Sequence, residues 1–192
     1  FPVQNERLKA VTPDDFKKIP GSPVAYWASK VLRHVFSSTP KLGDIAQTKQ
    51  GLATTNNSLF IRYWYEVCFN KVGFGFESQD DAFGSGLKWF PLNKGGGFRR
   101  WYGNNEYVIN FENNGKAICE YIDNTPGVNV KSNGRVINRE FYFKEGATWS
   151  SLSSGGFSMR WSPKGSVFET KGAMCFPKKN ENLFEILALF NS

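Results

Sequence analysis

Several signatures of enzymes and of membrane or secreted proteins are missing from this sequence. The 192 residues contain one histidine, His34, and three cysteines without a Cys-x-x-Cys pair, so no clustered metal site is expected. A single histidine also gives no support for a nucleophile–base pair. There is no run of about 18 apolar residues that could cross a membrane, and no membrane partner is expected. The first ten residues lack the apolar stretch of a secretory signal.

The glycine and acidic patterns do not complete a catalytic motif either. Gly73-Phe74-Gly75 and Gly95-Gly96-Gly97 match neither the dinucleotide nor the phosphate-loop spacing, and we interpret them as turn glycines. A metal-dependent nuclease would place an Asp and an acid-x-Lys pair on adjacent strands. Asp14 overlaps with Asp15-Phe16-Lys17, and Glu169-Thr170-Lys171 has no convincing partner. We therefore expect no catalytic residue in this chain.

The odd number of cysteines favours a reducing compartment, so a cytoplasmic location is expected. Cys68, Cys119 and Cys175 lie among apolar neighbours and are predicted to be small buried side chains. Asn56-Asn57-Ser58 matches a glycosylation pattern by chance, because nothing else suggests secretion. The sequence starts without Met and stops after an apolar stretch. We interpret residues 1–192 as a single domain excised from a larger chain.

Positive charge and aromatic rings are present in excess. Lys and Arg total 24 against 17 Asp and Glu, a net charge of +7. Aromatic residues make up 16% of the chain and include six Trp. A positive excess of this size favours a polyanionic partner such as nucleic acid.

Hydrophobic periodicity predicts an α+β fold with mixed small β-sheets and a few helices. An early helix is predicted with Ser22 as its cap and Pro23 at its first position, followed by an apolar stripe at Val24, Trp27, Ala28, Val31, Leu32 and Val35. Lys30, Arg33 and His34 lie off this stripe and are expected on the solvated face. A last helix is predicted from a capping box of Asn182 and Glu185. Strands are predicted near residues 60–67, 87–90, 107–111, 147–151, 157–161, 166–169 and 172–176, and short helices near 78–83 and 116–122.

Three polar, glycine-containing segments carry side chains that suit DNA: residues 49–57, 88–105 and 148–161. Lysine and arginine neutralise phosphates, arginine pairs bidentately with guanine, and the asparagine amide suits adenine. Serine hydroxyls beside glycines donate well to phosphate oxygens. The rings of Trp101 and Tyr102 either stack on a ligand or anchor their loop, while Trp89 and Trp149 are assigned to the core.

The order K-W-F-P-x-N-K-G-G-x-F-R-x-W-Y-G-N-N-E-Y-V along Lys88–Val108 resembles adenine-specific DNA methyltransferases of phage-defence systems, the BREX or PglX type, and related single-chain restriction-modification enzymes. Further matches lie in order at 19–27, 50–54, 60–64, 148–151, 154–155, 171–172 and 187–192. Residues 42–45 followed by Gly51 also resemble the opening of specificity domains in type I restriction systems.

In that family a catalytic domain grips the target adenine with an [N/D]-P-P-[Y/F] motif, beside a Gly-rich site for S-adenosylmethionine. This chain has no Pro-Pro dipeptide. The resemblance therefore implies a target-recognition-domain-like specificity region that binds double-stranded DNA. Methyl transfer and its cofactor would belong to a methyltransferase domain elsewhere in the parent chain, with other defence-system proteins as possible partners.

Within this interpretation two groups of side chains are expected to meet the DNA. Phosphate contacts are assigned to Lys94, Arg99, Arg100, Arg160 and Lys164, and contacts to base edges are assigned to Asn56, Asn57, Asn104, Asn105 and Ser153. Two other functions stay open. Exposed aromatics also suit a carbohydrate-binding module, although the odd cysteines and the net charge argue against it. The chain could instead contact a protein, such as a phage-encoded inhibitor or another subunit.

Overall fold

Contacts between residues divide the chain into two units, Phe1–Asp44 and Ile45–Ser192, and each is described by itself. The structure is a computed structural model that describes residues 11–178 and 183–192. Whether the whole chain acts as one recognition domain stays a prediction.

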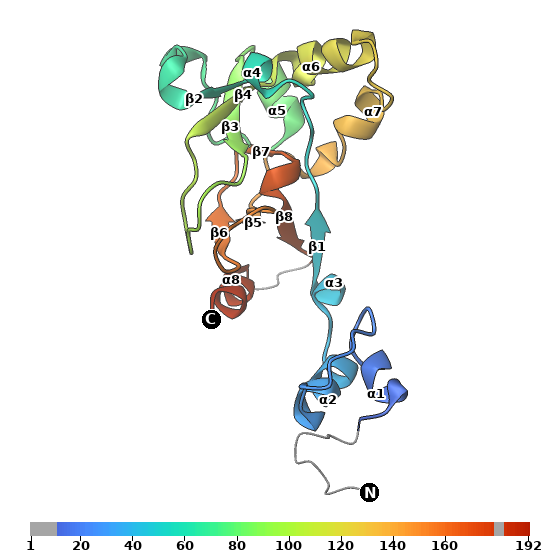
Figure 1. Cartoon of the computed structure of the whole chain (residues 1–192). Coiled ribbons are helices and arrows are strands. Elements are labelled where there is room, and N and C mark those ends of the chain that lie inside the picture. The colour runs from blue at the N-terminus through green and yellow to red at the C-terminus, as the bar shows by residue number, and fades with distance from the viewer. Residues whose placement is uncertain (1–10, 179–182) are drawn as a thin grey trace, which may run out of the picture. The chain divides into compact units, whose positions relative to one another are not determined.

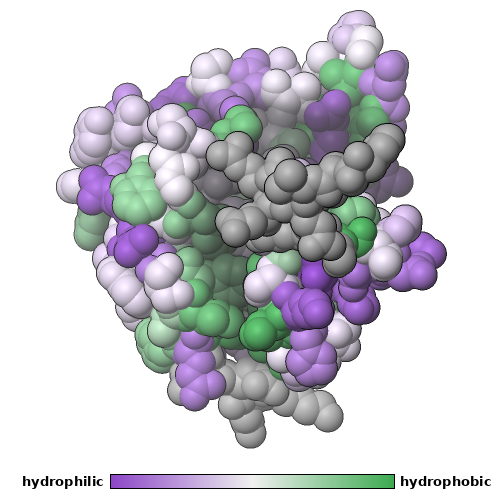
Figure 2. Space-filling model, turned by 60° about the horizontal axis from the view of Figure 1, so that its bottom comes forward, coloured by the Kyte–Doolittle hydropathy of each residue, from purple (hydrophilic) through white to green (hydrophobic). Residues whose placement is uncertain are grey.

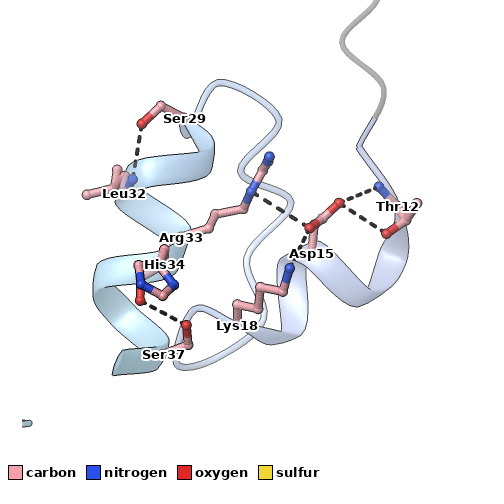
Figure 3. Close-up of polar contacts among 8 residues, drawn as sticks. All are labelled: Thr12, Asp15, Lys18, Ser29, Leu32, Arg33, His34 and Ser37. Atoms are coloured by element: carbon pink, nitrogen blue, oxygen red, sulfur yellow. Dashed lines mark hydrogen bonds and ion pairs between the residues drawn. The ribbon is translucent and has the colours of Figure 1, made fainter. Parts of the chain in front are cut away.

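The first unit is built on α1 (Pro13–Lys17) and α2 (Lys30–Ser38), and α3 (Leu42–Ile45) follows. Thr12 caps α1 through the carboxylate of Asp15, which also accepts a hydrogen bond from Lys18 at 2.9 Å (Figure 3). These bonds hold the pKa of Asp15 well below its ordinary value. At α2 the Ser29 hydroxyl accepts from the Leu32 amide at 3.1 Å.

The early helix was placed wrongly. It begins at Lys30 with Ser29 as its cap, whereas Ser22 lies in a left-handed conformation at φ 47° and caps nothing. The predicted faces are also wrong in part. Val24, Trp27 and Val31 of the predicted stripe are exposed, whereas Arg33 is buried and only 4.0 Å from Asp15. The small core of this unit consists of Ile19, Ala25 and Ala28, so Ala28 is the only described member of the predicted stripe that faces inward. His34 is exposed, as predicted.

Two four-stranded sheets form the frame of the second unit. The first has the order β1 (Ala46–Lys49), β8 (Met174–Pro177), β5 (Gly146–Trp149), β6 (Met159–Ser162), and all its neighbours are antiparallel. The second has the order β2 (Ile61–Tyr63), β4 (Tyr107–Asn110), β3 (Trp89–Asn93), β7 (Val167–Phe168), with β3 and β7 parallel. The predicted α+β class is confirmed.

Helices cover the ends of this frame. Figure 1 shows α4 (Asn57–Phe60), α5 (Gln79–Gly84) and α6 (Glu112–Asn124) with the second sheet and α8 (Leu183–Asn191) against the first. The short helix α7 (Ser132–Arg135) packs on α6. One-turn 3-10 helices lie at Trp64–Glu66 (η1), Phe69–Lys71 (η2), Arg139–Phe141 (η3) and Thr170–Gly172 (η4).

One core cluster of apolar side chains connects the two sheets and α6. Phe90, Ile109, Phe111, Ile118, Phe143 and Phe168 are among its fully buried members. Phe143 packs edge-on against Phe90, with ring centroids 5.5 Å apart. Burial of these rings away from water supplies the main driving force for this unit.

Most strands of the second unit lie within a few residues of their predicted places. The predicted strand at 60–67 is too long, because the chain turns into η1 after Tyr63, where Glu66 accepts from the Tyr63 amide at 2.8 Å. The last helix is confirmed as α8, while the cap assigned to Asn182 lies outside the described residues. Of the cysteines, Cys175 is buried as predicted, Cys119 is partly buried, and Cys68 is exposed, so the prediction is wrong for Cys68.

Candidate nucleic-acid interface

The two sheets meet where β3 and β7 end. The Glu169 amide, directly after β7, donates to the carbonyl of Asn93, the last residue of β3, at 3.0 Å. Gly172 lies so close to the same carbonyl that an added Cβ atom would be 2.2 Å from the Asn93 oxygen. The chain then passes from η4 into β8. The segment Glu169–Gly172 is therefore the junction between the sheets.

All three polar segments reach this junction. From residues 49–57, the Leu52 carbonyl accepts from the Thr170 amide at 3.0 Å, and the Gln50 amide donates to the Thr170 hydroxyl at 3.2 Å. From residues 148–161, the Ser151 amide donates to the Lys171 carbonyl at 2.9 Å. From residues 88–105, a Cβ atom on Gly95 would be 2.7 Å from the same Lys171 oxygen, so only glycine lets this loop approach.

The long loops also contact each other beyond the junction. The Trp101 amide donates to the Met159 carbonyl at 3.1 Å, and the Trp101 carbonyl accepts from the Trp161 amide at 2.8 Å. Gly155 lies against Phe98, at 3.5 Å from an added Cβ. We call residues 94–105, 150–158 and 170–172, together with Gln50, the loop cluster.

The loop cluster is cationic. The three polar segments contain six Lys or Arg and no Asp or Glu. Arg99, Arg100 and Lys171 are exposed, and Lys94 is partly exposed with its ammonium 4.7 Å from the centre of the Tyr107 ring. Across the described parts of the chain, none of these four cations is in an ion pair. They are available to an external anion.

One acid, Glu169, lies beneath the cluster. Its side chain is buried and Oε1 has no partner among the described residues. Burial raises the pKa of Glu169, and the positive charges of Lys94 and Lys171 oppose that rise. Because the carboxyl is buried, it presents no acidic oxygen to solvent on the exposed face of the cluster.

Two residues expected at the DNA are buried instead. The Arg160 side chain is 1% exposed; its Nη2 donates to the Ser150 hydroxyl at 3.3 Å, and Nε and Nη1 have no partner in the described chain. Burial lowers the pKa of its guanidinium. Asn104 is 7% exposed and donates to the Gly97 carbonyl at 2.9 Å, which closes its loop. Contacts to DNA would require accessible side chains. Arg160 and Asn104 instead lie under the surface of the loops and support it.

The other expected residues divide into two groups. Arg99, Arg100, Asn105 and Ser153 are exposed and belong to the loop cluster, as Lys94 does. Asn56 and Asn57 do not: Asn56 caps α4 and donates to the Tyr121 hydroxyl of α6 at 3.1 Å. Lys164 is exposed but pairs with Glu77 at 2.8 Å, which raises its pKa.

The sequence left open whether Trp101 and Tyr102 anchor their loop or stack on a ligand. The Trp101 backbone is anchored to β6 in a left-handed conformation at φ 72°, while its ring is 54% exposed. Tyr102 is 55% exposed and packs against Trp161 with ring centroids 5.9 Å apart. The backbone therefore anchors the loop, and both rings remain available for stacking. Trp89 and Trp149, assigned to the core, are partly buried.

Lys171 lies exposed in the loop cluster but is not among the residues that the sequence places at the DNA. In the sequence, Glu169-Thr170-Lys171 enters only as part of a nuclease pattern. A weak signal was present in Lys171-Gly172, which is among the family matches. Lys171 is about 75 residues away from Gly95 in the sequence and about 20 residues away from Ser151. Local sequence patterns do not show that residues so far apart lie close together.

The surface is also rich in exposed apolar side chains. Figure 2 shows hydrophobic residues gathered in patches among hydrophilic ones on the face that it views. The large apolar side chains that are more than half exposed include Trp101, Tyr102, Leu152, Phe157 and Leu189. Exposed apolar patches of this kind are typical of binding surfaces.

Residues 11–178 and 183–192 contain no group of three or more His, Cys, Asp or Glu side chains placed to hold a metal ion. Nor does any helix in this part of the chain have the length and hydropathy needed to span a bilayer.

The fold and surface thus define an α+β chain with a cationic loop cluster, and its relatives are adenine-specific methyltransferases by name. It is 44% identical over 194 residues to the adenine-specific methyltransferase PglX of Lacticaseibacillus casei (strain Zhang), covering 99% of this chain and 16% of that protein. It is 41% identical over 189 residues to the adenine-specific methyltransferase BrxX of Escherichia coli O9:H4 (strain HS), covering 96% of this chain and 14% of that protein. No family model matches the chain.

These two relatives confirm the resemblance to BREX-type, PglX-like adenine-specific methyltransferases. The chain is similar over nearly its whole length to one segment of these proteins. It spans about a sixth or less of the length of each relative.

Proposed function

We propose that this chain recognises double-stranded DNA and supplies the target specificity of an adenine-specific methyltransferase. The observation that carries this proposal is the convergence of three acid-free, glycine-rich segments on one junction, where Lys94, Arg99, Arg100 and Lys171 are free of ion pairs within the described residues. The names of the relatives, both adenine-specific methyltransferases, agree with it.

The proposed mechanism separates affinity from specificity. Arg99, Arg100 and Lys171 bind phosphates, and their contribution to affinity decreases as salt increases. Asn105 and Ser153 extend from the same cluster toward base edges, where a good bidentate contact discriminates by about 1–3 kcal/mol. Asn104 and Arg160 hold the loops in shape from beneath. We assign methyl transfer, with S-adenosylmethionine as the donor, to parts of the parent protein outside this chain.

Fluorescence anisotropy with a random-sequence duplex at roughly 50 and 200 mM salt tests the phosphate contacts. We expect binding that weakens steeply with salt. Arg99→Ala combined with Arg100→Ala should lower the salt slope by about 2, since each phosphate contact contributes about 0.9 to it. The matched control removes two exposed lysines outside the cluster, Lys71→Ala with Lys116→Ala, and should leave the slope nearly unchanged.

Equal losses in both double variants would reduce the interaction to a net-charge effect and contradict the assignment to the loop cluster. Binding that does not change with salt would favour the carbohydrate-binding alternative. Absence of duplex binding even at the lower salt would contradict the phosphate contacts proposed for this chain.

A segment exchange tests specificity without requiring the chain to bind alone. Residues 1–192 would replace the corresponding segment of the Lacticaseibacillus casei relative. The alignment with that segment covers 99% of this chain. We expect the chimera to methylate adenine in a different sequence from the recipient, as read by sequencing of modified genomic DNA. A chimera that keeps the target sequence of the recipient would overturn the proposal.

A further inference from the structure

A cavity of about 290 Å³ lies beside the loop cluster, between β3, β4 and the turn from β6 to β7. Tyr102 and Asn105 of the cluster form part of its wall, so the cavity and the cluster share one loop. Its volume is at the lower end of the range for small-ligand sites. The cavity therefore fits one ring system rather than a larger ligand.

Two backbone loops approach each other closely beside the cavity, at Gly165 and Gly75. Gly165 has a φ of +103°, and a Cβ atom at this position would lie 2.7 Å from the Gly75 nitrogen. Gly75 itself has a φ of +73°. Below them, the buried Asn93 amide donates to the Ser162 hydroxyl at 2.7 Å. A side chain at Gly165 would push apart the two loops that border the cavity.

The lining combines aromatic rings with a few polar groups. Phe74, Tyr102 and Tyr107 contribute the rings, and Asn105 and Lys164 contribute polar groups. The Tyr107 hydroxyl donates to the Tyr63 hydroxyl at 3.3 Å, which raises the pKa of Tyr107 to about 12, so this wall is uncharged near neutral pH. Among the described residues nothing hydrogen-bonds the Asn105 amide, and it can donate to and accept from a ligand.

We propose that this cavity takes a single nucleobase that has left the duplex next to the recognised sequence. A flat, uncharged ring with donors and acceptors on its edge matches aromatic walls with one amide, and pockets for extruded bases combine these features. The cationic loop cluster would hold the phosphates of the same strand beside the cavity entrance. This inference rests on the proposed function and adds a binding site to it.

The test compares three duplexes of one sequence: fully paired, with one extrahelical adenosine, and with one extrahelical abasic residue. The abasic duplex has the same break in the helix but no base to bind. Because the cost of unpairing is already met, we expect the extrahelical adenosine to bind about tenfold more tightly than either control. Replacing that adenine with 2-aminopurine gives a direct readout, since stacking on a tyrosine should quench its fluorescence.

Two variants locate the effect. Tyr102→Ala should abolish the quenching and bring the ratio of affinities for the adenosine and abasic duplexes to about one. The ratio is used because Tyr102 belongs to the loop cluster, and a loss common to all three duplexes cancels from it. Phe83→Ala removes a similarly exposed ring, 53% exposed, that does not line the cavity, and should keep both signals. Free adenosine monophosphate, added as competitor, distinguishes a site for any nucleotide from one that needs the attached duplex.

Equal affinity for the adenosine and abasic duplexes would overturn the cavity proposal and leave the proposed function intact, provided the paired duplex is bound. A preference that survives Tyr102→Ala and Asn105→Ala would place the base elsewhere and also overturn it. Failure to bind all three duplexes would count against both proposals.

Discussion

At the scale of single residues, the junction depends on Gly172 more than on any charged side chain. An added Cβ atom would lie 2.2 Å from the Asn93 oxygen and 2.9 Å from the Gly95 nitrogen, both of them backbone atoms. A backbone atom has no rotamer that avoids such a contact. Even the smallest side chain must therefore separate β3 from η4.

Gly172→Ala is expected to destabilise the second unit by at least about 2 kcal/mol, since overpacked buried positions have such effects. It should also weaken binding of duplex DNA, because Lys171 and the Gly95 loop would no longer lie next to each other. Urea unfolding and anisotropy measure the two effects. Gly97→Ala is the matched control: an added Cβ there meets nothing within 4 Å, and its stability should change by less than about 0.5 kcal/mol. A Gly172→Ala protein as stable as the control would show that the junction is not tightly packed.

Buried arginines show how far residue type alone can mislead. Arg33 was expected in solvent because it lies off the apolar stripe, and Arg160 was expected at phosphates, yet they are 5% and 1% exposed. A buried guanidinium is tolerated where neighbouring charges and hydrogen bonds compensate its desolvation. Asp15 does this in part for Arg33, and Ser150 in part for Arg160.

At the scale of elements, α8 is joined to the first sheet by one amide. The buried Asn191 side chain accepts from the Met159 amide at 2.9 Å and donates to the Met159 carbonyl at 2.8 Å. Leu183, Ile186 and Leu187 bury the apolar face of the same helix. The position of α8 therefore depends on a specific polar pair as well as on apolar burial.

Asn191→Ala should cost about 1–3 kcal/mol of unfolding free energy. It leaves the buried N–H of Met159 without its partner, whereas the Met159 carbonyl still accepts from the Trp101 amide at 3.1 Å. Thermal or urea denaturation measures the change. Asn129→Ala, at an exposed position, serves as the control and should stay within about 0.5 kcal/mol of the original chain. A loss no larger than that of the control would mean that apolar packing alone holds α8.

At the scale of the whole molecule, the second unit contains a complete core of its own. Every member of the main hydrophobic cluster lies between Leu52 and Phe176. The first unit has a separate core of only three described residues, Ile19, Ala25 and Ala28. A core that needs no residue of Phe1–Asp44 predicts independent folding of Ile45–Ser192.

A chain of residues 45–192 is therefore expected to unfold cooperatively, with a midpoint within about 5 °C of that of the full chain. Its affinity for duplex DNA should fall by less than about threefold, because the loop cluster lies entirely within it. Circular dichroism and anisotropy provide the measurements. If the shortened chain aggregates or unfolds without a transition, residues 1–44 are part of the folding unit. If it folds but no longer binds DNA, the first unit carries part of the interface.

The fold class, most strands of the second unit, α8 and the cationic segments could be predicted from the sequence, because these depend on periodicity, composition and turn residues over short distances. The sequence also carried the resemblance that the relatives confirm. It misplaced the start of α2, because apolar spacing does not distinguish an outer face from an inner one. Which loops share a surface became clear only from the fold. Gly172 and Lys171 join segments far apart in the chain, and burial removed Arg160 and Asn104 from solvent, because both depend on long-range packing that no local pattern encodes.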